Sequence, residues 1–570
     1  MSRPQPSRPR SARALRATLA LLAAVSVLTA CQGIPAAGPV SKGLSNLNTT
    51  DEEVIYEPNG PVPEMSQEDI VLGFLQAGSS SKDDYAIARR FLTPAYASDW
   101  TPSNGVIVDD GTREPVADES GTVTVSVQAL SFVDERGSMR LSEPGGSVPL
   151  RFELEQVSGQ WRINAASTDI VLDRSMFTTL YGQHNIYFQA PSTDALVPDA
   201  RWFPTRATTS TNIVTELLAG PAEPLDQGVL TSGFPSGTTL VAESVPVVNN
   251  RAHIDLSVEA LAADAAATEL MRKQLAASLQ SVSGVSEFLL TVDQSAFNQG
   301  DVILDSRSRY PKVQNTSLVM RENTIGEFNG TTTRPIGALG ELIVDADPDE
   351  IALSFDGETA AILRGGVVSQ VDEFGAHPID DRPKLIAPSI DQQGYVWTVP
   401  AGAPNDVHAT LLGTAQLQLT GSWVNGGEIR ALRISRDGSR AAVLLDVGEK
   451  TIVSLAGILR DESGNPTGFT EAIQIGTFEG EGIDLDWIDD GRVAVALRGD
   501  GTASGGSRIA IVGLGLFPSE SPIAAKVVSL AGANSRSQLR ILDDKGALYA
   551  PRGSAWSQYY EDVQLLVKRG

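Results

Sequence analysis

The sequence predicts a multidomain protein in which two α+β domains are followed by an all-β propeller of about five or six blades. Three observations lead to this prediction. Helical and strand-like apolar patterns occur together in two successive segments, 63–178 and 183–298. A hairpin pattern then recurs through residues 315–570. The chain has 570 residues, 41% of them hydrophobic, which is enough for several domains with ordinary cores.

Residues 1–30 have the organisation of a secretory signal peptide. Five arginines and no acidic residue precede an apolar stretch from about Ala17 to Leu28, and small residues close it at Thr29 and Ala30. The stretch is shorter than the roughly 20 residues that a permanent membrane helix needs. The charged region contains no Arg-Arg pair, which favours general secretion over the twin-arginine route.

The signal peptide ends in Leu28-Thr29-Ala30-Cys31, and Cys31 is the only cysteine of the chain. This motif resembles the lipobox of bacterial lipoproteins. The resemblance implies that a lipid such as palmitate is attached to Cys31 and that the signal peptidase cuts between Ala30 and Cys31. Two or more acyl chains give stable anchoring, so the implied location is the extracytoplasmic face of the cell membrane. An ordinary signal with a stray cysteine is the alternative.

Cysteine and charge content exclude several classes of function. One lipidated cysteine leaves no thiol for a disulfide, a metal site or a nucleophile. Without the signal's arginines, 39 basic residues face 70 acidic ones. Such a field repels phosphate backbones, so nucleic acid is not an expected partner. The acidity fits solubility outside the cell, with a specific acidic recognition face as the alternative.

Residues 31–62 and 63–178 differ sharply in pattern. The first segment is rich in Gly, Pro, Ser and Asn and predicts a lipidated N-terminus with a flexible tether. Ser66 and Asp69 then form an N-cap signature for a helix. A second helix is predicted to pass through Tyr85 and Leu92 and to stop at Thr93-Pro94. Alternating strands follow at 123–127, 148–154 and 160–163. This order predicts an α+β domain with a curved antiparallel sheet, similar in pattern to the NTF2-like cone.

Segment 183–298 alternates strands and helices. Strands are predicted at 186–188, 252–256 and 288–292, and helices at 211–219 and around Met271. Four local motifs closely resemble the GerMN domain of bacterial envelope and sporulation proteins: Glu216–Pro221, Phe234–Thr238, Ser244-Val245 and Ile254–Ser257. Gly220-Pro221 stops a helix, and Pro235-Ser236-Gly237 forms a turn. The apolar face that carries Met271 predicts a core helix, not a cofactor site.

Segment 315–570 contains a weak repeat in which a strand, an Asp-Gly type turn and a second strand follow one another. The copies centre on Asp356, Asp391, Asp437, Asp489 and Asp543. Each copy has the pattern of a β-hairpin. Repeats of roughly 40–50 residues built of such hairpins are typical of propeller blades. A pair of stacked β-sandwiches is the alternative fold.

The sequence contains no catalytic, metal or cofactor signature, and we therefore expect no enzyme activity. Its four histidines (His184, His253, His377, His408) lack zinc-ligand spacing. His253 is expected on the solvent face of its strand. The run Asp345, Asp347, Asp349 lacks the glycine and the closing glutamate of a calcium loop. Asp489-Asp490 could form a carboxylate pair for glycoside hydrolysis, but both residues lie in a repeated turn that favours Asp for backbone reasons.

The order of a lipobox, an α+β domain, a GerMN-like domain and a propeller resembles the actinobacterial lipoprotein LpqB family over nearly the whole chain. Ile70–Leu75 and Ala88–Pro94 look like that family's N-terminal signature. The resemblance implies a non-catalytic accessory role beside the MtrA–MtrB two-component system, through contact with the extracytoplasmic part of the MtrB sensor kinase. The processes implied are cell-envelope homeostasis and division. Only Cys31 carries a functional role over from the family.

Two other functions remain open from the sequence. A cell-wall glycan or peptidoglycan binder would use the propeller or the GerMN-like face. An envelope hydrolase would use propeller carboxylates. A deep pocket with paired, pKa-perturbed carboxylates favours the enzyme. An aromatic-lined groove favours glycan, and a broad apolar patch on either α+β domain favours a protein partner.

Overall fold

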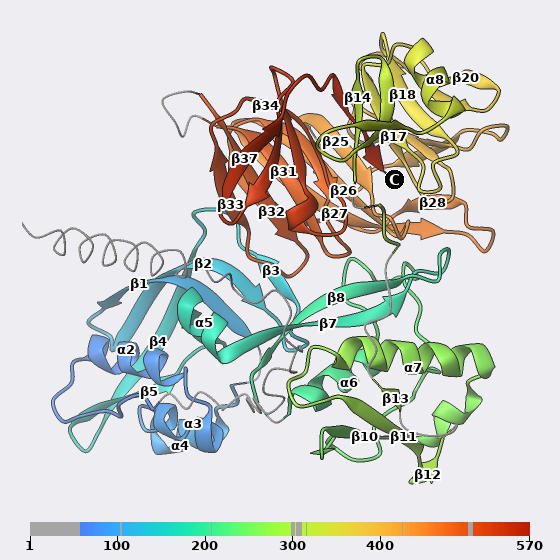
Figure 1. Ribbon diagram of the computed structural model, residues 1–570. Helices are drawn as coiled ribbons and strands as arrows, with labels where there is room; N and C mark the ends of the chain where they lie inside the picture. The colour runs from blue at the N-terminus through green and yellow to red at the C-terminus, as the bar shows by residue number, and fades with distance from the viewer. Residues whose placement is uncertain are drawn as a thin grey trace, which may run out of the picture. The chain divides into compact units, whose positions relative to one another are not determined.

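The computed structural model describes residues 57–569 (Figure 1), apart from 103–104, 207, 298–301, 304–310, 315, 425 and 500–504. The predicted signal peptide, Cys31 and most of the predicted tether lie outside the described residues. No helix in the described part combines the length and the apolar character that a membrane span needs.

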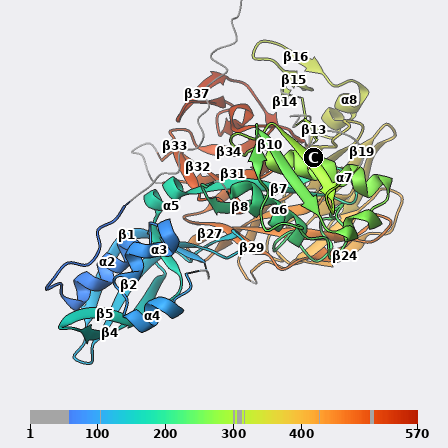
Figure 2. The same ribbon diagram turned by 90° about the horizontal axis from the view of Figure 1, so that it is seen from below.

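The first domain packs three helices against a mixed sheet (Figures 1 and 2). Ser66 caps the first helix, and its reciprocal hydrogen bonds with Asp69 form a complete capping box, as predicted. The helices are α2 (Gln67–Ala77), α3 (Lys82–Arg89) and α4 (Pro94–Asp99). The strands are β1 (Val106–Ala117), β2 (Thr122–Val133), β3 (Met139–Leu141), β4 (Ser147–Val157), β5 (Gln160–Ala165) and β6 (Ile170–Asp173), in the order β5-β4-β2-β1-β6.

Two local predictions for this domain were wrong. The second helix ends at Arg89, and Thr93-Pro94 begins helix α4 instead of stopping α3. Thr93 accepts a hydrogen bond from the Tyr96 N–H, and proline suits the first position of a helix because its missing N–H has no partner there. The sheet is also not wholly antiparallel, because β6 pairs with β1 in parallel, with Val106 opposite Ile170.

The second domain places two helices between a long hairpin and a small sheet (Figure 1). Helix α5 (Arg174–Leu180) leads into the hairpin of β7 (Tyr181–Gln189) and β8 (Leu196–Pro204). Helices α6 (Thr209–Ala219) and α7 (Ala265–Leu279) follow, with η1 (Val258–Ala262) before α7. The sheet contains β9 (Val247–Val248), β10 (Arg251–Leu256), β11 (Glu287–Val292), β12 (Ser295–Ala296) and β13 (Val302–Ile303). Met271 is fully buried in the core, as the sequence predicted.

Six sheets form the propeller in the described residues. Blade 1 contains β14 (Ser317–Arg321), β15 (Thr324–Phe328), β16 (Thr333–Pro335) and β38 (Leu565–Leu566). Helix α8 (Ala338–Asp345) precedes blade 2, which contains β17 (Glu350–Leu353), β18 (Ala360–Arg364), β19 (Val367–Asp372) and β20 (Gly375–Asp380). Blade 3 contains β21 (Ser389–Ile390), β22 (Val396–Thr398), β23 (Asp406–Thr410) and β24 (Leu417–Thr420).

The remaining blades complete the ring. Blade 4 contains β25 (Glu428–Ile434), β26 (Arg440–Val447), β27 (Lys450–Arg460) and β29 (Ile473–Glu479), with β28 (Pro466–Phe469) inserted. Blade 5 contains β30 (Gly482–Trp487), β31 (Arg492–Arg498), β32 (Ser507–Gly513) and β33 (Ser519–Ile523). Blade 6 contains β34 (Val527–Ala531), η2 (Arg536–Gln538), β35 (Arg540–Asp543), β36 (Leu548–Arg552) and β37 (Ala555–Tyr560).

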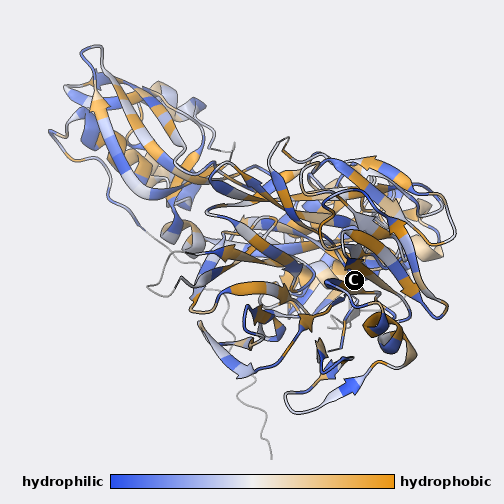
Figure 3. Cartoon of the chain, turned by 90° about the horizontal axis from the view of Figure 1, so that it is seen from above, coloured by the Kyte–Doolittle hydropathy of each residue, from blue (hydrophilic) through white to orange (hydrophobic). Residues whose placement is uncertain are grey.

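The ring closes by pairing the two ends of the propeller segment. Strand β38 joins blade 1 beside β14, with Val319 opposite Leu566. Strand β39 (Lys568–Arg569) then adds to β17, and the Lys568 ammonium lies 2.8 Å from the buried Asp484 carboxylate of blade 5. Hydrophobic residues concentrate in the strands (Figure 3), and separate apolar clusters fill the spaces between blades. Closure through one ring excludes the stacked-sandwich alternative.

Candidate functional site

A repeated aspartate organises the first turn of blades 2 to 5. In each turn one carboxylate oxygen accepts the backbone N–H two residues further along. The pairs are Asp356 with Glu358, Asp391 with Gln393, Asp437 with Ser439 and Asp489 with Gly491, at 3.0–3.1 Å. Because each turn joins the first two strands of its blade, these four turns lie on one rim, which we call the turn rim. The backbone role predicted for Asp489 is confirmed.

The fifth copy of the repeat lies elsewhere. Asp543 makes the same contact with the Lys545 N–H at 3.0 Å, but it follows the second strand of blade 6. Successive turns of an antiparallel blade alternate between its two ends. The Asp543 turn therefore lies on the rim opposite to the other four, which the sequence repeat alone did not reveal.

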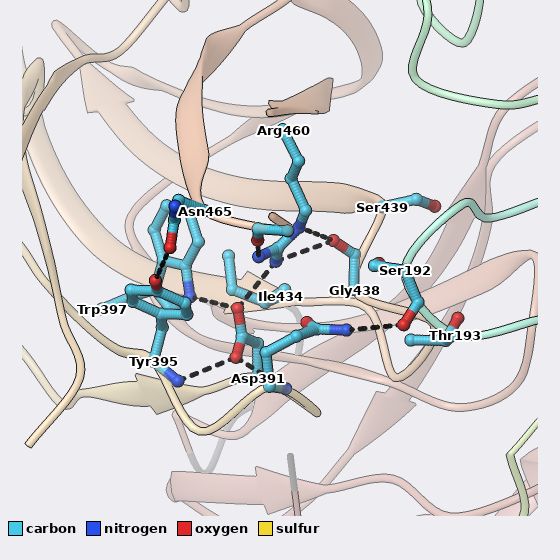
Figure 4. Close-up of polar contacts among 12 residues, drawn as sticks. Ser192, Thr193, Asp391, Tyr395, Trp397, Ile434, Gly438, Ser439, Arg460 and Asn465 are labelled. Atoms are coloured by element: carbon cyan, nitrogen blue, oxygen red, sulfur yellow. Dashed lines mark hydrogen bonds and ion pairs between the residues drawn. The ribbon is translucent and has the colours of Figure 1, made fainter. Parts of the chain in front are cut away.

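The tip of the β7–β8 hairpin docks on the turn rim (Figure 4). The Thr193 hydroxyl donates a hydrogen bond to the Asp437 backbone carbonyl at 2.9 Å. In blade 3, the Gln393 side-chain amide donates to the Ser192 carbonyl at 3.4 Å. The hairpin thus contacts the first turns of two successive blades, a contact for which the sequence carries no recognisable signal.

Beneath the hairpin tip, Asp391 links blade 3 to blade 4 (Figure 4). Its carboxylate accepts hydrogen bonds from the Tyr395 backbone N–H at 2.9 Å and from the Trp397 indole N–H at 3.0 Å. The Arg460 guanidinium of blade 4 donates to the same carboxylate at 2.7 Å. Every partner is at least partly buried, so the network fixes the two turns that receive the hairpin.

Asp437 is the most deeply buried carboxylate of the turn rim, with no exposed surface. It accepts hydrogen bonds from the Ser435 and Ser439 hydroxyls, and the Arg440 guanidinium lies 2.6 Å from it. Burial by itself would raise the pKa of Asp437, but the Arg440 charge and the hydrogen bonds from Ser439 outweigh burial and lower that pKa. The carboxylate is therefore held in its charged form.

The base of the hairpin is fixed by Trp202, which contacts both the first domain and the propeller. Its backbone N–H donates to the Gly137 carbonyl of the first domain at 2.8 Å. Its ring lies 4.9 Å from that of Phe177 in helix α5 and 6.1 Å from that of Phe517 in blade 5, measured between centroids. Its indole N–H donates to the Gly515 carbonyl at 2.8 Å. The hairpin is thus held at its tip by polar contacts and at its base by aromatic packing.

Between tip and base, the hairpin and blades 4 and 5 enclose a cavity of about 450 Å³, which we call the hairpin cavity. Its lining includes Gln183 and Asn185 from β7 and the turn residues Asp490 and Arg492. Burial, together with the neighbouring Asp489, raises the pKa of Asp490. Asp489 itself is paired with Arg492, whose Nε lies 2.8 Å away. The two neighbouring carboxylates therefore differ, because one is engaged in an ion pair and the other faces the cavity.

No described group of three or more His, Cys, Asp or Glu residues could hold a metal ion. The four histidines occupy separate places. His184 contacts the Ser281 hydroxyl at 3.0 Å, His377 lies 3.2 Å from Asp372, and His408 lies beside Asp380. His253 is half-buried on β10 between buried Ala252 and Ile254, consistent with the predicted alternation. Asp347 and Asp349 both pair with Arg364 at the surface, which fits the predicted solvated turn.

One short stretch of the second domain is rich in exposed apolar side chains. Five large hydrophobic residues within a span of 21 residues are exposed: Val241, Val247, Val248, Val258 and Leu261. Two of them form β9, which ends its sheet in the order β12-β11-β10-β9. We call this set the β9 apolar strip. Large exposed apolar groups at a sheet edge are typical of a surface that binds another chain.

Family models match three parts of the chain. Residues 60–178 match the N-terminal domain of lipoprotein LpqB, residues 185–296 match a domain described as sporulation and spore germination, and residues 327–565 match the LpqB β-propeller domain. The first GerMN domain of the sporulation protein GerM from Bacillus subtilis aligns with a TM-score of 0.18 at 14% identity, covering 22% of this chain and 97% of that one. The family-model matches define a multidomain protein with a GerMN domain and a propeller.

Whole-chain relatives identify the family. Lipoprotein LpqB of Corynebacterium diphtheriae is 24% identical over 563 residues, covering 91% of this chain and 92% of that one. Lipoprotein LpqB of Cutibacterium acnes is 29% identical over 277 residues, covering 48% of this chain and 46% of that one. The chain belongs to the LpqB lipoprotein family, whose name marks it as a membrane-anchored lipoprotein.

Proposed function

We propose that this lipoprotein lies on the extracytoplasmic face of the membrane and acts as a non-catalytic accessory of a two-component system. Its partner would be the ectodomain of an MtrB-like sensor kinase, and the process would be envelope homeostasis and division. The observation that supports a protein partner most directly is the β9 apolar strip. Surfaces with clustered, exposed apolar side chains usually serve protein contacts.

The geometry of the β9 apolar strip suits a contact with an extended segment. Val247 and Val248 are both exposed, Val248 to 53%, on a terminal strand only two residues long. An edge strand offers backbone N–H and C=O groups to an added strand, and flanking side chains supply specificity. Leu261, in η1 after β10, is 62% exposed and adds a further apolar side chain to the surface of this domain.

A lipid on Cys31 would raise the local concentration of the protein around a membrane-bound partner. Anchoring both molecules in one membrane makes their encounter resemble an intramolecular event, so a modest contact suffices. The second domain, which carries the strip, is joined to the propeller by Trp202 and by the hairpin tip.

In-cell cross-linking of the full-length protein tests this proposal, with captured partners identified by mass spectrometry. We expect a sensor-kinase ectodomain to be enriched with the unaltered protein. Its recovery should fall strongly with the double substitution Val247→Asp and Val248→Asp, and also with Cys31→Ser. Val116→Asp alters a valine of the first domain that is more exposed than either Val247 or Val248, and it serves as the control. Recovery of the same kinase with all variants would contradict a role for the strip, and recovery of no kinase would contradict the proposal.

A further inference from the structure

The hairpin cavity has the features of a second binding site, separate from the β9 apolar strip. Its volume of about 450 Å³ lies within the range of roughly 300–1,000 Å³ that is typical of small-molecule sites. The walls are formed by β7 and β8 on one side and by blades 4 and 5 on the other. Such pre-formed cavities between domains are common places for ligands.

One wall of the hairpin cavity presents two side-chain amides. Strand β7 alternates, so Ile186 and Phe188 enter the core of the second domain while Gln183 and Asn185 line the cavity. Neither amide makes a side-chain hydrogen bond with any residue that the structure describes. Each amide offers both N–H donors and a carbonyl acceptor. This wall can therefore both donate to and accept from hydroxyl groups.

The opposite wall presents one carboxyl group that the protein does not engage. Asp490 lines the cavity, and no hydrogen bond or ion pair joins its side chain to another residue in the described ranges. The other charged side chains of the lining are paired. Asp489 is bound by Arg492, and Arg440 is bound by Asp437. Because these charges cancel in pairs, the Asp490 carboxyl group is the remaining charge of the lining, and its ionised form disfavours an anionic ligand.

Apolar side chains complete the lining. Leu455, Ile511 and Leu514 come from the blades, and Pro198 comes from β8. A sugar ring matches this combination of polar and apolar lining residues, because its hydroxyl groups lie around the edge of the ring and its C–H groups lie on the two faces. We propose that the hairpin cavity binds a neutral, polyhydroxylated ligand, a glycan segment of one or two sugar residues. Hydroxyls at the edge of the sugar would donate to Asp490 and exchange hydrogen bonds with Gln183 and Asn185.

Ligand-observed NMR titrations test this inference on the full-length protein in detergent micelles. The probes are four neutral disaccharides (chitobiose, cellobiose, lactose and mannobiose) and glucuronic acid as a charged sugar. We expect at least one neutral disaccharide to bind, and we expect Asp490→Ala and Gln183→Ala each to weaken its binding about tenfold or more. Glucuronic acid should bind more weakly than that disaccharide.

The chain offers a matched control for the key carboxylate. Asp544 follows Asp543 as Asp490 follows Asp489, but it lies exposed on the opposite rim. Asp544→Ala should leave the dissociation constant unchanged, and thermal unfolding should confirm that all three alanine variants fold. Failure of all four disaccharides to bind, equal weakening by Asp544→Ala, or tighter binding of glucuronic acid would overturn the inference. None of these outcomes bears on kinase recovery, so the two proposals succeed or fail separately.

Discussion

The first turns of blades 2 and 4 share a motif but differ in surroundings. Ser354-Phe355-Asp356-Gly357 and Ser435-Arg436-Asp437-Gly438 form the same turn. In each, the serine hydroxyl and a backbone N–H donate to the aspartate, at 2.6 and 3.0 Å in blade 2 and at 2.9 and 3.0 Å in blade 4. Asp356 is exposed, whereas Asp437 lies buried beneath the hairpin tip with Arg440 beside it.

A comparison of these two turns distinguishes the features that the local sequence determines from those that depend on packing with other parts of the protein. The aspartate shapes the turn in both blades, because its side chain accepts N–H groups that the turn itself leaves unpaired. Of these two aspartates, only Asp437 has a carboxylate that also neutralises a buried guanidinium, and its backbone carbonyl accepts a hydrogen bond from the hairpin of another domain. One residue type therefore has a local role in blade 2 and an additional interdomain role in blade 4.

The largest expected effect comes from removing the two aspartates in parallel. Asp437→Ala removes the carboxylate that neutralises the buried Arg440 guanidinium, which should cost about 3–5 kcal/mol of unfolding free energy. Asp356→Ala loses only exposed turn contacts and should cost about 1 kcal/mol. Urea unfolding followed by tryptophan fluorescence measures both. Similar losses in the two variants would show that the ion pair with Arg440 adds nothing to the stability of the blade 4 turn.

Acid should reduce the difference between the contributions of Asp437 and Asp356 to the stability of the fold. The pKa of Asp437 is lower in the folded protein than in the unfolded chain, where it is about 3.9. Its ionised form therefore stabilises the fold at any pH above about 3.9. That stabilisation is lost as the pH falls through the lowered pKa. The gap in urea midpoint between the unaltered protein and Asp437→Asn should therefore be constant near neutral pH and shrink below about pH 4. The corresponding gap for Asp356→Asn serves as the reference. A gap at Asp437 that stays constant down to pH 3 would contradict the assignment.

Much of the architecture could be predicted because it is encoded locally. The capping box at Ser66, the alternating strands of the first domain and the Asp turns of the propeller all depend on neighbouring residues. Strand β1 was missed because Asp109, Asp110 and Gly111 interrupt its apolar pattern, and the register of its pairing with β2 shifts there. Ring closure by β38 joins residues far apart in the chain, which no local pattern specifies.

The candidate sites were less predictable than the fold. The sequence identified Asp489-Asp490 as a pair, but the different roles of the two carboxylates depend on Arg492 and on strand β7 of another domain. The docking residues Ser192 and Thr193 look like an ordinary polar turn, because a hydroxyl gains its role only from the carbonyl that it meets. Interdomain sites of this kind depend on how the domains pack, and neither secondary-structure propensities nor short sequence motifs contain this information.

A smaller loss of unfolding free energy is expected when only the contact at the hairpin tip is weakened. Thr193→Val removes the hydroxyl that donates to the Asp437 carbonyl and should cost about 1 kcal/mol, since Trp202 still fixes the base of the hairpin. Hydrogen exchange should quicken at the tip, where the Ala190 N–H donates to the Ala195 carbonyl, and remain unchanged in blade 2. Unchanged exchange at Ala190 would show that the tip contact contributes nothing to holding the hairpin.

The smallest expected change in unfolding free energy is a gain in stability, and it comes from a substitution of Asp490. Burial and the neighbouring Asp489 raise the pKa of Asp490, so its charged form opposes folding at neutral pH. Asp490→Asn should therefore stabilise the protein slightly near pH 7, by about 0.5 kcal/mol or less, as is usual for a partly exposed site. The gain should vanish as the pH falls below about 3.9, where both folded and unfolded chains bind the proton. Urea midpoints measured between pH 7 and pH 3 test this, with Asp544→Asn as the control. A loss of stability at neutral pH would mean that Asp490 has a partner within the protein, and this would also remove the free carboxylate on which the glycan site depends.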